Sequence, residues 1–99
     1  MVRNILMRLG KEVPLLLEGK GITPEKVVVF GSHAERRATK RSDIDMMIVS
    51  KDFRGKSIFE KAELVRGFHM ELIDCFHAPF DILYYSDTEW EREASPIIR

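Results

Sequence analysis

The first stretch of the chain mixes apolar and polar residues with a helical period. Its apolar positions between residues 2 and 17 recur at steps of three and four, which places them on one face of a helix. The pattern predicts a helix over residues 2–18 that ends at Gly19 and Gly21. Proline has no N–H for the helical ladder, so we expect either a kink or two short helices at Pro14.

Two later stretches have the pattern of strands. Residues 27–30 (Val-Val-Val-Phe) are a continuous β-branched and aromatic run, typical of a strand buried on both faces. Residues 43–49 alternate instead, with one wholly apolar face. That apolar face carries Ile44, Met46 and Ile48, and the opposite face carries Asp43, Asp45, Met47 and Val49.

The longest apolar stripe begins after Ser57. Ser57 and Glu60 have the spacing of a capping box, in which each side chain satisfies the backbone N–H of the other residue. Apolar residues continue at helical spacing as far as Phe76, so we expect one helix of about five turns. Gly67 lies inside it at a cost of about 1 kcal/mol relative to alanine. Residues 80–84 predict a third strand, and residues 86–93 a short acidic helix anchored by Trp90.

The order of these elements defines the expected architecture. Strands separated by a long helix predict an α/β fold with a small mixed β-sheet packed by helices. The chain has 99 residues, enough for one hydrophobic core and too few for two. We therefore expect a single domain over residues 1–99.

Composition and charge narrow the class of protein. Hydrophobic residues make up 44% and charged residues 32% of the chain, as in an ordinary globular domain. The 16 basic and 16 acidic residues cancel, which argues against a globally basic nucleic-acid-binding protein. The single cysteine, Cys75, excludes a disulfide framework and a zinc site built from cysteines. No apolar run approaches the ~20 residues of a membrane span, so we expect a cytoplasmic protein that contacts neither membrane nor nucleic acid.

Three aspartates lie in the predicted strands, although aspartate is a poor strand former. Asp43 and Asp45 face the same side of one strand, with Cα atoms about 6.5 Å apart. A proton or a cation must relieve their repulsion, and Mg²⁺ prefers carboxylate oxygens while keeping positions for water and phosphate. Asp81 can join them if its strand lies beside theirs, and about three carboxylates hold two metal ions. Solvated carboxylates at the strand ends are the alternative.

Gly31 and Ser32 directly follow the first strand. Glycine allows a sharp turn and a close approach of the backbone to a ligand. Free backbone N–H groups at a helix start, next to a serine hydroxyl, can bind phosphate. A Gly-Ser pair by itself is an ordinary turn, so this pair gains meaning only together with the aspartates.

The combined spacing resembles a known family. Gly31-Ser32, ten intervening residues and then the Asp-x-Asp of Asp43 and Asp45 are similar to the signature of the nucleotidyltransferase superfamily related to DNA polymerase β. The surrounding segment, VVVFGSHAERRATKRSDIDMMIV, looks like the minimal nucleotidyltransferase (MNT) branch, whose members are often encoded beside a HEPN-domain partner. The resemblance covers about residues 20–90 and implies a polymerase β palm-like fold.

Carried over position by position, the resemblance implies a role for each residue. Gly31 and Ser32 would hold the β- and γ-phosphates of a nucleoside triphosphate, and Asp43 and Asp45 would bind both of two Mg²⁺ ions. Asp81 would bind the ion that activates the incoming hydroxyl, which attacks the α-phosphate as pyrophosphate leaves.

One position departs from the family pattern. Glycine is common where this chain has Arg36, within GSHAERRATKR, so the loop is stiffer and more basic. Arg36 and Arg37, followed by Lys40 and Arg41, could bind the triphosphate or an acidic partner, or could form a solvated loop. The departure puts the nucleotide contacts in doubt but leaves the metal ligands intact.

The resemblance implies a Mg²⁺-dependent enzyme that transfers AMP from ATP to a hydroxyl. Its most specific form is an antitoxin that modifies a tyrosine of a HEPN toxin. The chain is short for a protein that also holds its acceptor, so we expect a partner protein or an oligomer to complete the site. The first helix and the tail around Trp90 are candidate surfaces. The alternatives are a module that neutralises a partner by contact alone and an enzyme that modifies a small molecule.

Overall fold

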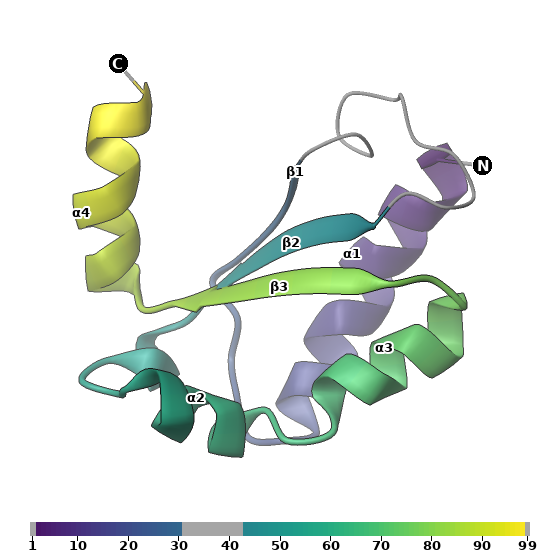
Figure 1. Ribbon diagram of the computed structural model, residues 1–99, viewed down its shortest axis with the longest axis horizontal. Coiled ribbons are helices and arrows are strands. Elements are labelled where there is room, and N and C mark those ends of the chain that lie inside the picture. Colours follow the sequence, from purple (N-terminus) through teal and green to yellow (C-terminus); the bar gives the residue numbers. More distant parts are fainter. Residues whose placement is uncertain (1, 31–42, 99) are drawn as a thin grey trace.

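A three-stranded mixed sheet organises the chain in the computed structural model (Figure 1). The structure describes residues 2–30 and 43–98, with side chains over residues 5–30 and 43–93. Strand β1 (Lys26–Phe30) runs antiparallel to β2 (Ile44–Val49), and β2 runs parallel to β3 (Phe80–Tyr85). The order β1-β2-β3 makes β2 the central strand. The predicted α/β fold with a small mixed sheet is confirmed.

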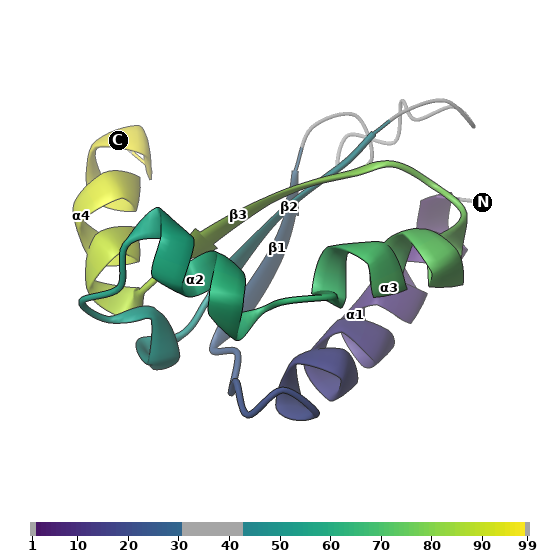
Figure 2. The same ribbon diagram turned by 60° about the horizontal axis from the view of Figure 1, so that its bottom comes forward.

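Three helices lie on one side of this sheet (Figure 2). They are α1 (Val2–Glu18), α2 (Ile58–Leu64) and α3 (Phe68–Phe76). A parallel pair of strands requires a crossover, and α2 and α3 supply it between β2 and β3. Helix α4 (Asp87–Ile98) follows β3 and stands at the end of the sheet, beside the 3₁₀ turn at Lys51–Phe53. Among the described helices, none combines the length and the apolar character that crossing a membrane requires.

The core lies between the sheet and α1, α2 and α3. Ile44, Met46 and Ile48 are completely buried, which confirms the predicted alternation of β2. The helices and loops contribute Leu9, Val13, Leu17, Ile22, Phe53, Val65, Phe68 and Leu72, and β3 adds Phe80. Because β-strand side chains alternate, every second residue of each strand faces away from this core, onto what we call the outer face of the sheet.

Two sequence predictions about single elements change at particular residues. Helix α1 has the predicted bounds and continues through Pro14, so the alternative of two short helices is wrong, and Leu9, Val13 and Leu17 on both sides of Pro14 are buried in the core. The strand over residues 27–30 is not buried on both faces. It is an edge strand with residues of intermediate burial, since only Val27 and Val29 pack against the core.

The prediction of one continuous five-turn helix after Ser57 is wrong, because the structure has a break in its middle. The capping box of Ser57 and Glu60 is present, but Gly67 adopts a left-handed φ of 84° and separates α2 from α3. The apolar positions of α2 do not all face the core: Ile58 and Phe59 are 81% and 83% exposed, whereas Lys61 is buried. The last helix also runs beyond the predicted residue 93, to Ile98.

The conformation of Gly67 gives a stability prediction. An added Cβ would meet only the Lys20 ammonium, at 3.5 Å, so the cost of Gly67→Ala is conformational, about 1–2 kcal/mol of unfolding free energy. Urea denaturation measures it. The matched control is Gly10→Ala in α1, where a Cβ meets nothing within 4 Å and helix propensity predicts a gain of about 1 kcal/mol. Equal effects of the two substitutions would contradict the assigned break.

Candidate functional site

The register of the sheet brings two aspartates from distant parts of the chain side by side. In the parallel β2–β3 pair, Asp45 lies opposite Asp81. Neighbouring strands are about 4.8 Å apart, so the two carboxylates emerge next to each other on the outer face. The condition set by the sequence, that the strand of Asp81 lies beside that of Asp45, is met.

A third strand extends this arrangement. In the antiparallel β1–β2 pair, Phe30 lies opposite Asp45, so Phe30, Asp45 and Asp81 form one row across the sheet, which we call the carboxylate row. Asp81 is exposed and Asp45 is half-buried. Asp43 is exposed and lies two residues before Asp45, just outside β2.

The remaining predicted site residues lie outside the described part of the chain. These are Gly31, Ser32, Arg36 and Arg37. Their segment begins directly after Phe30, the β1 member of the carboxylate row. The backbone therefore enters the predicted phosphate-binding segment at the position where the two paired carboxylates emerge.

The donor set can be compared with the needs of a metal ion. Within residues 2–30 and 43–98, no three or more His, Cys, Asp or Glu side chains are gathered closely enough to hold a metal. Mg²⁺ is commonly bound through only one or two carboxylates, with water and substrate phosphates as its other ligands. Asp45 and Asp81 provide two carboxylates on one face, so the paired donors fit such an ion in kind and in number.

The outer face changes character away from the carboxylate row. The next row consists of Val28, Met47 and Leu83, and it is apolar. The third row consists of Lys26, Val49 and Tyr85. Val49 is only 1% exposed, and the Lys26 ammonium lies 5.9 Å from the centre of the Trp90 ring of α4. Trp90 is thus placed against its own chain, and the outer face is acidic at one end and covered at the other.

Polar contacts fix α4 at that covered end. Ser86 and Glu89 form a reciprocal cap: Ser86 N–H donates to Glu89 Oε1 at 2.8 Å, and Glu89 N–H donates to Ser86 Oγ at 3.1 Å. Arg54 donates two hydrogen bonds to Asp87. The Arg54 hydrogen bond lowers the pKa of Asp87, and the Lys61 hydrogen bond lowers the pKa of Glu89.

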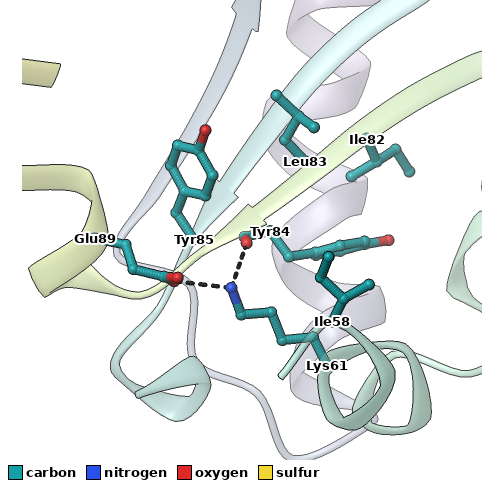
Figure 3. A pocket seen from close by; sticks show the side chains of 7 residues that line it. All are labelled: Ile58, Lys61, Ile82, Leu83, Tyr84, Tyr85 and Glu89. Carbon is teal, nitrogen blue, oxygen red and sulfur yellow. Dashed lines mark hydrogen bonds and ion pairs between the residues drawn. The ribbon is translucent and has the colours of Figure 1, made fainter. Parts of the chain in front are cut away.

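Lys61 is the functional-surface residue that sequence reasoning missed. Its ammonium donates to Glu89 Oε1 at 2.8 Å and to the Tyr84 carbonyl at 2.9 Å (Figure 3). Burial also raises the pKa of the adjacent Tyr84 to about 12. Lys61 lies three residues after Ile58 and four before Val65, so helical spacing placed it on the stripe, but lysine is rarely buried unless it is paired.

Known proteins resemble the chain over most of its length. A family model described as polymerase beta, nucleotidyltransferase matches residues 16–95. A Sulfolobus solfataricus protein provisionally named a nucleotidyltransferase, with a crystal structure at 1.40 Å resolution, superposes with a TM-score of 0.60. The two sequences are 22% identical, and the match covers 92% of this chain and 78% of the other. This likeness supports the fold. No curated protein sequence matches the chain.

The paired carboxylates predict a measurable repulsion. Like charges directly opposite each other on neighbouring strands are destabilising, by about 0.2–1 kcal/mol. Without divalent cations, Asp81→Asn should therefore raise the free energy of unfolding. The same substitution in an Asp45→Asn background should gain nothing, because the repelling partner is absent. Denaturation of all four proteins in a chelator measures this coupling, which 1 M salt should reduce. Additive effects would show that the two carboxylates do not interact.

Proposed function

The chain belongs to the polymerase beta nucleotidyltransferase family, and we propose that it transfers a nucleoside monophosphate, AMP from ATP, to a hydroxyl acceptor. The observation that carries this proposal is the carboxylate row, in which Asp45 and Asp81 stand side by side next to the end of β1. Two paired carboxylates beside the segment that begins with Gly31 and Ser32 suit a reaction between a metal-bound triphosphate and a hydroxyl.

In this proposal each part of the site has a separate task. Asp45 and Asp81 would hold Mg²⁺, with Asp43 as the further carboxylate for a second ion, and the bound ions would supply positive charge to the reacting oxygens. Gly31 and Ser32 bind the β- and γ-phosphates through backbone N–H groups and the serine hydroxyl. Arg36 and Arg37 add positive charge beside the triphosphate.

The reaction proposed for this site is a single displacement. The acceptor oxygen forms a bond to the α-phosphorus while the bond from that phosphorus to the bridging oxygen breaks. Pyrophosphate leaves, and Asp81 accepts the proton of the hydroxyl. The side chains contribute chiefly by positioning the reactants and by electrostatic stabilisation.

We further propose that the acceptor belongs to a partner protein, a HEPN-domain toxin for which this chain is the antitoxin. Exposed apolar side chains support a protein partner: Ile58 is 81% and Phe59 is 83% exposed, both on α2. The same observation supports the alternative of a binding module that neutralises its partner by contact alone. Catalysis separates these two hypotheses.

Metal binding can be tested without any partner. At a Mg²⁺ concentration 100 times its dissociation constant, we expect the free energy of unfolding to rise by about 2.7 kcal/mol, because the ion binds only the folded chain. The double substitution Asp45→Asn plus Asp81→Asn should abolish this gain. Asp74→Asn, on α3 across the sheet, is the control that should retain it. Equal Mg²⁺ responses of all three proteins would remove the carboxylate row as the metal site.

Transfer itself is tested with ATP labelled at the α-phosphate, Mg²⁺ and, as the acceptor, the purified product of the neighbouring gene. We expect label on the partner, and a decrease of at least about 10²-fold with Asp43→Ala plus Asp45→Ala, because electrostatic stabilisation of the transition state is lost. Asp74→Asn should transfer at the wild-type rate. Neutralisation of the toxin without any label transfer would favour the binding module instead.

A further inference from the structure

Strand β3 is an edge of the sheet, and its backbone groups point in two directions. Ile44 N–H donates to the Pro79 carbonyl at 2.9 Å, and Ser50 N–H donates to the Tyr85 carbonyl at 3.0 Å. In a parallel ladder with this register, residues 81, 83 and 85 direct their backbone groups towards β2. Residues 80, 82 and 84 therefore direct theirs away from the sheet, along the free edge.

Side chains already occupy two of these outward carbonyls. His69 Nε2 donates to the Phe80 carbonyl at 3.0 Å, and the Lys61 ammonium donates to the Tyr84 carbonyl at 2.9 Å. Between them, no residue of the described segments bonds the outward N–H or C=O of Ile82. Unpaired edges invite strand pairing, and folded proteins normally block them. Here the outward carbonyls on both sides of Ile82 are capped, so among the described residues of this edge Ile82 is the one whose N–H and C=O are both open.

The open residue lies in a groove rather than on a flat surface (Figure 3). The edge groove has a volume of about 350 Å³ and is lined by Ile58, Lys61, Glu89 and four consecutive residues of β3, Ile82 to Tyr85. Its apolar lining is exposed: Ile58 by 81% and Leu83 by 41%. Among the described residues, α2 and α4 line the groove on the two sides of β3. An extended chain can therefore lie along the strand between these helices.

Charge further defines the occupant. Asp81 is exposed directly before the groove, and Glu89 lines its other end. The cation in the lining, Lys61, is already paired with Glu89 at 2.8 Å. The pair leaves that end of the groove without net charge, so the groove has an apolar centre beside the Asp81 carboxylate, which complements an apolar residue next to a basic residue.

We propose that the edge groove binds an extended segment of a partner polypeptide, with one apolar residue next to a basic residue, as an additional strand on β3. Ile82 N–H and C=O supply the two backbone hydrogen bonds, and Ile58 and Leu83 contact the apolar side chain. The inference goes beyond nucleotidyl transfer and does not depend on catalysis. A second copy fits less well, because pairing of two β3 edges about Ile82 would bring the His69 cap of one copy onto the Lys61 cap of the other.

A substitution at Ile82 can remove only the outward donor. Because Ile82 N–H does not point towards β2, Ile82→Pro deletes it without breaking a β2–β3 hydrogen bond. Ile82→Ala is the matched control, which loses the same side-chain packing and keeps the N–H. As the probe, a displayed library of random heptapeptides is selected on the wild-type chain, and the enriched sequence is synthesised.

We expect enrichment of peptides with an apolar residue next to a basic one. The synthetic peptide should bind Ile82→Ala more tightly than Ile82→Pro, by roughly 2- to 10-fold, as expected for one backbone hydrogen bond. If Ile82→Pro does not fold, N-methylation of the peptide residue opposite Ile82 should produce a similar loss with the wild-type chain. Equal binding by the two variants, or no effect of N-methylation, would overturn the proposal. So would dimerisation of the chain that Ile82→Pro abolishes, since the occupant would then be a second copy.

Discussion

The parallel register between β2 and β3 is the constraint on which the other features depend. It is held at its two ends by the hydrogen bonds from Ile44 to Pro79 and from Ser50 to Tyr85. Side chains alternate along a strand, so a slip of one residue would move Asp81 to the core face and an apolar neighbour to the outer face. The same register decides which backbone groups of β3 remain at the edge. The carboxylate row and the edge groove are therefore two results of one pairing.

Lys61 connects three elements around that pairing. It extends from α2, caps a β3 carbonyl and pairs with Glu89 in the first turn of α4. Removing a lysine from water costs several kcal/mol unless its hydrogen bonds are replaced, and here two acceptors within 2.9 Å replace them. Ile58 and Phe59 of the same helix are exposed while Lys61 is buried, so α2 offers apolar side chains to the surface beside a buried charge.

Sequence periodicity predicted most of the fold, because burial imposes a period on β2 and on the helices. The alternation of Ile44, Met46 and Ile48 and the capping box at Ser57 follow from local chemistry alone. The failures arise where tertiary contacts decide. A glycine in a helical pattern does not reveal whether it continues the helix, and Gly67 ends it. The spacing of the aspartates indicated a shared site, but only the strand register could place Asp81 opposite Asp45. Helical spacing placed Lys61 on the apolar stripe, but nothing local indicated its partners, Glu89 and the Tyr84 carbonyl.

The carboxylate row exists only in chains whose strands β2 and β3 have already paired. Asp45 and Asp81 belong to strands joined by a long crossover that contains two helices, and contacts between such distant segments form only after a large loop has closed. Hairpin-like pairing of β1 with β2 can form without them. The repulsion between the two carboxylates thus begins only when the crossover has packed, and partly folded chains do not carry it. An ion held by Asp45 and Asp81 would therefore stabilise only those chains in which the two distant strands have already paired.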